Sequence, residues 1–498
     1  MSLQQLFVAL LAAGLVVLVS IVATRVASRV GLPSLLLFLA LGVVLGEDVL
    51  GIEFNDAQLA QNLGTAALAV ILIEGGLTTR WSDIRSVVAP AGVLASAGIG
   101  VSTTVTAVGA HYLVNLGWQQ ALLMGAIVAS TDAAAVFSIL RVLPLSVRVG
   151  GLLEAESGFN DAPSVILVLL FSSTPFHLSM PAFIGQLLYE LAAGAAIGLG
   201  VGWLGAVTLP RIALPASGLY PLATFALGIV AFAAAGAAHA SGFLAAYLAA
   251  LILANAGLPH RAATRSFAEG LAWLAQIGLF ILLGLLVIPH QLPRELLPAL
   301  VVGLVLLLAA RPLAVAASLV AFRVPFREQA FLSWAGLRGA VPIVLATFPI
   351  VRGVPNSDRL LNIVFVLVVI FTLIQGPSLA PLARRLGLVP TEATRASLVE
   401  SAPLDVLDAE LLTMTIAPRS RLHSVSIVEL RLPDPSVVTL IIRDGRTFVP
   451  ADDTQLKVGD QLLIVTTRVA RHDTERRLRA VSRRGPLAHW FDEYGEPD

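Results

Sequence analysis

Long runs of apolar residues, separated by short polar connections, follow one another along most of the chain. A run of about 20 apolar residues is long enough to cross the hydrocarbon core of a membrane as a helix. We therefore predict about thirteen spans between residue 4 and about residue 388, and an all-α polytopic membrane domain over residues 1–388. The predicted spans cover residues 4–24, 32–46, 57–77, 87–112, 119–140, 149–172, 181–209, 218–238, 241–257, 270–288, 295–322, 328–350 and 360–383.

The composition supports a membrane protein. Hydrophobic residues make up 57% of the chain and charged residues only 13%, whereas a soluble domain is nearer 25% charged. The formal net charge of zero gives no bulk attraction to nucleic acid, and the absence of cysteine excludes disulfides and thiolate metal sites. The first apolar run has neither a basic start nor a small-residue cleavage site, so we interpret it as a retained helix.

Arginine residues gather in alternate connections. The connections that follow odd-numbered spans hold thirteen of them and the others hold three. The positive-inside rule then places the N-terminus outside and the C-terminus in the cytoplasm. The thirteen are Arg25, Arg29, Arg80, Arg85, Arg141, Arg148, Arg211, Arg261, Arg265, Arg323, Arg327, Arg384 and Arg385, and the three are Arg294, Arg352 and Arg359.

An odd number of spans allows two inverted six-helix repeats, spans 1–6 and 8–13, joined by span 7. Inverted repeats with broken helices at the membrane midplane are typical of secondary transporters. Spans 5 and 12, at corresponding positions, both carry interruptions: Ser-Thr-Asp at 130–132, and Gly336, Gly339 and Pro342 around Arg338. Proline in a helix interior removes a backbone hydrogen bond. We therefore predict that spans 5 and 12 are broken crossing helices.

Acidic residues lie in the middle of spans 5 and 6. Ser157, Asn160 and Asp161 share one helical face, since they are three or four positions apart. Their carboxylate, hydroxyl and amide oxygens suit a hard cation, and carbonyls freed at a break near Thr131 could add more. Carboxylates at membrane depth usually handle ions or protons. Competition of a proton and a monovalent cation for Asp161 would couple their exchange.

Other charged residues have two interpretations each. Asp132 is either part of the ion site or a cap on a broken half-helix. Glu156 either ligates the ion or forms a structural ion pair with Arg338 between spans 6 and 12. Glu74, in span 3, is either a wall of the site or an interfacial acid. Arg311 could snorkel towards the interface and is given no role.

Three motifs carry a resemblance to a known family: TDAAAVF at 131–137, ES followed by ND within 156–161, and GLRGAVP at 336–342. Together they resemble the bacterial monovalent cation/proton antiporters of the CPA1 group, and the resemblance covers residues 1–388. It implies a homodimer in the bacterial inner membrane, a crossover of spans 5 and 12, and an elevator-like alternating-access cycle. An Asn-Asp pair is associated in this family with electroneutral, one-for-one exchange.

The resemblance also implies roles for particular residues. Asp161 would carry the ion and the proton, and Asn160 would orient it. The matching ligand positions are Ser157, the carbonyl of Thr131, and Glu74. Three further charges match family positions: Asp132 faces the helix ends, and Glu156 and Arg338 form a stabilising pair.

After residue 388 the composition changes. Residues 389–403 form a polar linker, 404–485 a small α+β cytoplasmic domain, and 486–498 a tail. Strands are predicted at LLTMTI (411–416), VVTLIIR (437–443) and QLLIVTT (461–467), a turn at 443–445 and a short helix at 423–430. This segment closely resembles an RCK_C (TrkA-C) regulatory domain without a preceding GxGxxG domain. It is either a stabilising or dimerising appendage or a gate that senses a ligand such as a nucleotide.

The sequence thus predicts a potassium/proton antiporter with a cytoplasmic regulatory domain. No cofactor is expected beyond the transported K⁺ or Na⁺ and H⁺, and the expected partners are a second copy and membrane lipid. A Na⁺/H⁺ antiporter is the alternative within the class. A ligand-gated cation channel is the alternative outside it, but the chain has no TVGYG-like filter. We expect no enzyme, because no activated nucleophile or metal-ligand cluster is evident in the sequence.

Overall fold

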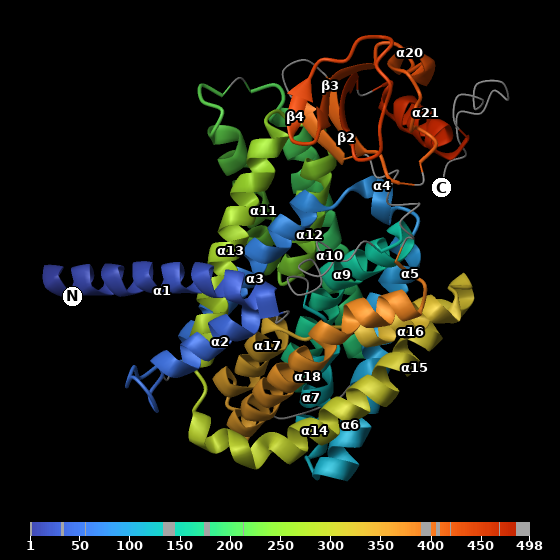
Figure 1. Ribbon diagram of the computed structural model, residues 1–498. Helices are drawn as coiled ribbons and strands as arrows, with labels where there is room; N and C mark the ends of the chain where they lie inside the picture. The colour runs from blue at the N-terminus through green and yellow to red at the C-terminus, as the bar shows by residue number, and fades with distance from the viewer. Residues whose placement is uncertain are drawn as a thin grey trace. The chain divides into compact units, whose positions relative to one another are not determined.

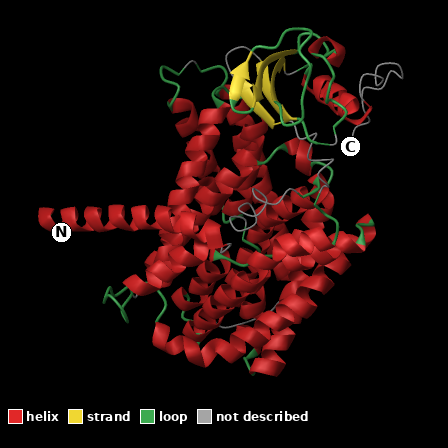
Figure 2. Cartoon of the chain, in the orientation of Figure 1, coloured by secondary structure: helices red, strands yellow, loops and turns green. Residues whose placement is uncertain are grey.

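The computed structural model describes residues 2–30, 34–54, 56–132, 145–173, 180–212, 214–389, 400–404, 409–418, 420–467 and 469–484. The chain divides into two compact units, Met1–Leu388 and Val389–Asp498. Helices make up the first unit, and the strands lie in the second (Figure 2).

The first unit is a set of helices that follow the predicted apolar runs. Its first half contains α1 (Leu3–Val30), α2 (Ser34–Leu45), α3 (Ala57–Thr78), α4 (Trp81–Ile84), α5 (Val88–Val93), η1 (Leu94–Gly98), α6 (Ile99–Val114), α7 (Trp118–Ala129) and α9 (Val147–Phe171). Its second half contains α10 (Met180–Thr208), α11 (Leu219–Ala237), α12 (Gly242–Asn255), α13 (Arg261–Leu285), η2 (Pro289–Glu295), α14 (Leu296–Val305), η3 (Leu306–Ala310), α15 (Arg311–Leu319), η4 (Val320–Phe322), α16 (Phe326–Ala335), α17 (Ala340–Val351) and α18 (Ser357–Arg385).

Among the described residues, eight helices are long and apolar enough to cross a membrane. A ninth is added if α16 and α17, which bend by 54° at the break between them, count as one span. The shorter apolar helices α2, α7 and α12 lie at three more of the predicted spans. The unit is therefore a mostly helical, multi-pass membrane domain, and the number thirteen stays a prediction.

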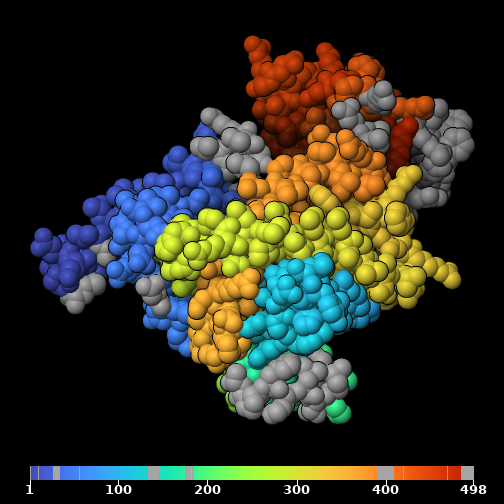
Figure 3. Space-filling view, turned by 90° about the horizontal axis from the view of Figure 1, so that it is seen from below, coloured from blue at the N-terminus to red at the C-terminus, as the bar shows by residue number. Residues whose placement is uncertain are grey.

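Helix α9 lies in the middle of this unit and packs against α3, α5, α7, α12 and α17 (Figure 1). Helix α6 packs against α14, and the space-filling view shows them side by side on one face (Figure 3). By contrast, α1 extends away from the other helices (Figure 1), and large apolar side chains such as Leu11 (64% exposed) cover it. Apolar exposure on this scale suits a helix in contact with lipid.

Both predicted breaks lie among the described residues. Helix α7 ends at Ala129. Ser130 is extended and residues 131–132 are not helical, while the rest of that span, 133–140, lies outside the described residues. The second break is the segment 336–339 between α16 and α17. Pro342 does not cause it: this proline lies in the first turn of α17, where a helix needs no backbone donor. Gly336 and Gly339 lie at the two ends of the break, where α16 ends and α17 begins.

The second unit contains one antiparallel sheet with strand order β1-β2-β5-β3-β4. Its core includes alternate residues of β2 and β5, such as Leu412 and Ile464, together with Leu478 of the last helix. The elements are β1 (Glu400–Leu404), β2 (Ala409–Thr415), α20 (Ile427–Leu430), β3 (Val437–Arg443), β4 (Arg446–Phe448), β5 (Gln461–Thr467) and α21 (Arg471–Arg484).

The predicted α+β class, the three strands and the turn at 443–445 are confirmed. Two details differ. Strand β1 pairs with β2 although it begins in the segment predicted as a linker, where proline and small residues give no strand pattern. The helix predicted at 423–430 is confined to Ile427–Leu430. The predicted tail, 486–498, and linker residues 390–399 lie outside the described residues.

An ion pair between the partly exposed Arg443 and the buried Asp460 joins β3 to the start of β5. Both carboxylate oxygens of Asp460 accept hydrogen bonds from Arg443, at 2.7 and 2.6 Å, and one also accepts from the backbone N–H of Lys457 at 2.8 Å. Burial of the Asp460 carboxylate raises its pKa, but these hydrogen bonds outweigh burial and hold the pKa below its usual value.

Candidate functional site

The two breaks cross one another and satisfy each other's backbone groups. The Asp132 N–H donates to the carbonyl of Leu337 at 3.0 Å, and the Asp132 carboxylate accepts from the N–H of Ala340 at 2.9 Å. In return, Arg338 Nη1 donates to the carbonyl of Ser130 at 2.8 Å. Asp132 thus caps the amino end of α17, where a negative charge meets the positive end of the helix dipole. This is the capping role that the sequence offered for Asp132.

Gly339 allows this crossing to be so close. A Cβ atom at this position would lie 1.7 Å from the Asp132 carboxylate oxygen and 2.7 Å from its carbon. Any side chain would therefore push Asp132 away from the end of α17. The second glycine of the break, Gly336, has a different neighbour, because a Cβ there would lie 2.8 Å from Nε of Arg311.

A buried cluster of oxygen atoms joins the first break to α9. Ser130 Oγ donates to Asp161 Oδ1 at 2.6 Å and lies 3.4 Å from Asn160 Oδ1. The amide of Asn160 donates to the hydroxyl of Thr131, which is 3.2 Å from the hydroxyl of Ser157. All five side chains are at most 2% exposed. The structure therefore brings together Asp161, Asn160, Ser157 and Thr131, as the sequence predicted.

Ser130 was missed as a site residue. It directly precedes Thr131 and Asp132 in the interrupted run, and that adjacency is the signal that could have identified it. Glu74 is buried on α3, at 2% exposure. Its part in the site stays a prediction.

The partner of Glu156 was predicted wrongly. Glu156 pairs with Arg311 on α15, with Nη1–Oε1 and Nη2–Oε2 distances of 2.6 and 3.3 Å, and not with Arg338. Both side chains are at most 3% exposed. Arg311 cannot snorkel from that depth, so it requires a counter-charge. Arg338 lies in the break, where its guanidinium donates a hydrogen bond to the carbonyl of Ser130 at the end of α7.

The chemistry of the cluster is that of an ion site made of oxygen atoms. It contains one carboxylate, two hydroxyls besides that of Ser130, and one amide, all suited to a hard cation without a soft donor. The hydroxyl of Ser130 can donate to the ionised carboxylate of Asp161. Within the described residues, no group of three or more His, Cys, Asp or Glu side chains could hold a resident metal ion.

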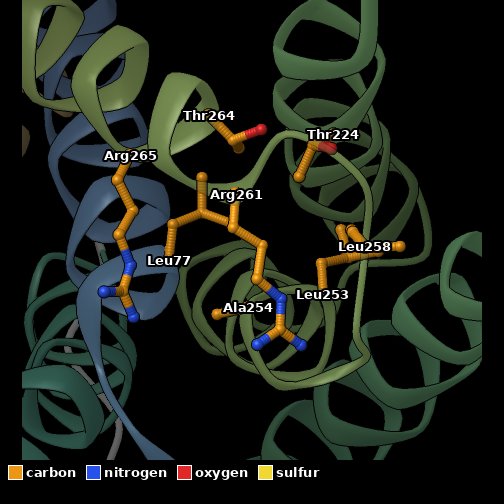
Figure 4. A pocket seen from close by; sticks show the side chains of 8 residues that line it. All are labelled: Leu77, Thr224, Leu253, Ala254, Leu258, Arg261, Thr264 and Arg265. Carbon is orange, nitrogen blue, oxygen red and sulfur yellow. The ribbon is translucent and has the colours of Figure 1, made fainter. Parts of the chain in front are cut away.

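A small pocket lies elsewhere, among α3, α11, α12 and α13. The guanidinium groups of Arg261 and Arg265 point in the same direction beside it (Figure 4). The lining residues are Leu77, Thr224, Leu253, Ala254, Leu258, Arg261, Thr264 and Arg265. None of the predicted site residues lines this pocket, so it is separate from the cluster at Asp161.

Comparison with known proteins gives consistent results for the two units. The transmembrane sodium/hydrogen exchanger family matches residues 15–385, and the TrkA-C domain matches residues 411–479. The sodium proton antiporter MjNhaP1 from Methanocaldococcus jannaschii superposes with a TM-score of 0.65 at 21% identity, covering 76% of this chain and 99% of that one. That likeness shows the fold.

Curated relatives match over nearly the whole chain. The K⁺/H⁺ antiporter NhaP of Alkalimonas amylolytica is 39% identical over 469 residues, which is 92% of this chain and 80% of the relative. The K⁺/H⁺ antiporter NhaP2 of Shewanella sp. (strain ANA-3) is 37% identical, over 90% of this chain and 79% of the relative. The Na⁺/H⁺ antiporter NhaP of Pseudomonas aeruginosa is 29% identical, over 69% of this chain and 86% of the relative. The chain is therefore a transporter rather than an enzyme, and it belongs to the sodium/hydrogen exchanger family with a TrkA-C domain near its C-terminus.

Proposed function

We propose that this protein exchanges K⁺ for H⁺ across the bacterial cytoplasmic membrane, and that both ions use the carboxylate of Asp161. The observation that carries the proposal is the buried oxygen cluster around Asp161, where two broken helices cross. The relatives named K⁺/H⁺ antiporters, at 37–39% identity, favour K⁺. Exchange of Na⁺ for H⁺ is the alternative, and the more distant Pseudomonas relative bears that name.

In the proposed cycle, Asp161 takes up a proton on one face of the membrane and releases it on the other. When Asp161 is ionised, its carboxylate, the hydroxyl of Ser157, the carbonyl of Thr131 and the carboxylate of Glu74 ligate the cation. Asn160 keeps Asp161 oriented, because its amide is held by Thr131. Cation and proton exclude one another at a single carboxylate. For coupled exchange the site must also cross the membrane only when loaded, because an empty site that crossed would let one ion move without the other.

The proposed architecture has thirteen crossings in two inverted repeats. The breaks in α7 and between α16 and α17 fall at equivalent positions of the two repeats. A second equivalence supports this arrangement: π-helical turns interrupt the fourth span at η1 and the eleventh at η3. Each π-helical turn also packs against the other span, η1 against α15 and η3 against α6. Such turns are frequent at functional sites.

We also propose the surroundings of the exchanger. The N-terminus lies outside and the TrkA-C unit in the cytoplasm, because arginines concentrate in the connections on that face. Two copies form a homodimer surrounded by lipid, and the TrkA-C unit regulates exchange by binding a small ligand such as a nucleotide. A channel is less consistent with this arrangement, since two broken helices in inverted repeats are typical of secondary transporters.

Proton-gradient dissipation in inside-out vesicles tests the central proposal. Addition of K⁺ should collapse an imposed proton gradient in the wild type and fail to do so in Asp161→Asn, which remains folded. Exchange that persists in the variant would remove Asp161 from the mechanism. A larger signal with Na⁺ than with K⁺ would favour the alternative cation.

Deletion of residues 404–498 tests regulation in the same assay. We expect exchange to remain and its rate or pH dependence to change. A truncated protein that behaves as the wild type would assign the TrkA-C unit a purely structural role.

A further inference from the structure

A second acidic residue, Glu154, lies on the same face of α9 as Asp161. The two are seven positions apart, so they stand two turns, or about 10.5 Å, from one another along the helix axis. Glu154 is the nearer to the end of α9 that carries Arg148, the proposed cytoplasmic side. Unlike Asp161, Glu154 is only partly buried. It therefore lies between cytoplasmic water and the ion site.

Glu154 is hydrogen-bonded to Thr79 at the end of α3. The Thr79 hydroxyl is also 2.8 Å from the carbonyl of Gly75. One hydroxyl has one proton, so Thr79 can donate to the Glu154 carboxylate or to Gly75, but not to both. If it donates to Gly75, the carboxyl of Glu154 must be protonated and must itself donate to Thr79. The contact thus accommodates Glu154 in both of its protonation states.

The aromatic ring of Tyr247, from α12, occupies the space between the two acids. It is 0% exposed and lies against Gly158, where an added Cβ would be 2.6 Å from the ring atoms Cε2 and Cζ. Gly158 is one turn after Glu154 and one turn before Asp161. Only a glycine leaves room for the ring at this level of α9.

The hydroxyl of Tyr247 makes no hydrogen bond of good geometry in this conformation. It is buried beside the hydroxyl of Thr79, its neighbouring hydrogen-bonding group, and lies near Glu154. Buried hydroxyls are almost always hydrogen-bonded. A small movement of the Glu154 side chain, or of α9 relative to α12, would supply the partner.

We propose that Glu154 is a second proton- and cation-accepting carboxylate, on the path between the cytoplasm and Asp161, and that the ring of Tyr247 separates the two acids in this conformation. This inference rests on the proposed function. On release to the cytoplasm, the proton leaves the carboxyl of Asp161, is taken up by the carboxylate of Glu154, and passes to water. The cation moves the opposite way through the same two positions.

The charges around Glu154 are consistent with a transfer position. Arg80 attracts its carboxylate and Asp83 repels it, both from the segment that follows α3. From α12, the neutral hydroxyl of Tyr247 approaches it. Among the residues that the structure describes, no arginine forms an ion pair with Glu154 as Arg311 does with Glu156, so the carboxylate can exchange its occupant.

Kinetics measured separately from each face of reconstituted vesicles test the inference. Glu154→Gln keeps a hydrogen-bonding partner for Thr79 but can carry neither charge nor proton. We expect the KM for K⁺ to rise about fivefold or more on the cytoplasmic face and to stay within about twofold on the outer face. Glu154→Asp should restore most of the difference. The matched control is Glu295→Gln, which removes a carboxylate at another helix end and should leave both KM values unchanged.

A structural role predicts a different result. If Glu154 only ties α9 to α3, Thr79→Val should reproduce the effect of Glu154→Gln, and both faces should be affected equally. Either that pattern or wild-type KM values for Glu154→Gln would overturn the inference. Asp161→Asn, assayed in parallel, separates the two proposals: an inactive Asp161→Asn beside an unaltered Glu154→Gln refutes only the role of Glu154.

Accessibility gives a test that does not depend on activity. The chain has no cysteine, so Glu154→Cys introduces a single thiol. A membrane-impermeant thiol reagent should label it from the cytoplasmic face and not from the outer face. Labelling from the outer face alone, or from neither face, would contradict the proposed path.

Discussion

The pairing of Glu156 with Arg311 predicts a large energetic coupling between α9 and α15. Replacing Arg311 with methionine leaves the Glu156 carboxylate buried and without its counter-charge. Replacing Glu156 with glutamine does the reverse. The double variant removes both charges together, so it should lose much less stability than the two single variants combined.

The magnitude follows from the distances. Two unit charges 2.6 Å apart attract one another by about 6 kcal/mol at an effective dielectric constant of about 20. Loss of one partner of a buried pair costs about 3–5 kcal/mol in practice. Arg311 also donates to the carbonyl of Leu332 at 3.1 Å, and that contribution cancels in the cycle. We expect a coupling free energy of about 3 kcal/mol between residues 156 and 311.

Equilibrium unfolding by SDS in mixed micelles provides the measurement, with the same cycle for Glu156 and Arg338 as the matched control. Arg338→Met should also destabilise the protein, because it removes the hydrogen bond to the carbonyl of Ser130. Its coupling to Glu156 should nevertheless stay below about 1 kcal/mol. A coupling of Glu156 to Arg338 that equals or exceeds the coupling to Arg311 would refute the assignment of the pair.

Two further predictions concern other parts of the chain. Gly339→Ala should displace the Asp132 carboxylate from the end of α17 and reduce exchange about 10-fold or more, because a charge-assisted bond of about 1.5–3 kcal/mol is lost. The control Gly278→Ala, where a Cβ meets nothing within 4 Å, should leave vesicle transport unchanged. Equal activities of the two variants would show that the crossing tolerates the displacement. Asp460→Asn should destabilise the TrkA-C unit by about 1.5–3 kcal/mol at pH 7 by weakening its bond to Arg443. Because folding lowers the pKa of Asp460, the wild-type unit should lose this contribution as the pH falls from the ordinary pKa of an aspartate, near 4, through the pKa in the folded state. Limited proteolysis of the full chain measures both effects, and identical proteolysis of variant and wild type would contradict them.

The central part of the site could be predicted because its signals are local. Ser157, Asn160 and Asp161 share a helical face at any packing arrangement, and acidic residues within apolar runs stand out against their surroundings. The positions of the breaks could also be predicted, since glycines and a Ser-Thr-Asp triplet interrupt the apolar runs of spans 5 and 12. Most helix boundaries followed from the lengths of those runs, although α13 begins at Arg261, nine residues before the predicted start at 270.

Pairings between distant spans could not be predicted in the same way. Arg311 and Arg338 are both single arginines in apolar segments, and only the packing of α15 and α16 decides which one reaches Glu156. Ser130 contacts Asp161 because the chain is extended at this residue, directly after α7 ends, and the hydroxyl then points towards Asp161. No periodicity in the sequence encodes either event.

The pairing of opposite charges at the crossing bears on how the cell's membrane voltage acts on the protein. Asp132 and Arg338 contribute one charge of each sign there, as do Glu156 and Arg311 beside it. In the proposed cycle, Asp161 crosses neutralised, by a proton in one direction and by a potassium ion in the other. Moving an unbalanced charge costs about 2.3 kcal/mol per 100 mV. An exchanger built in this way does no work against the voltage, so only the two concentration gradients set its direction.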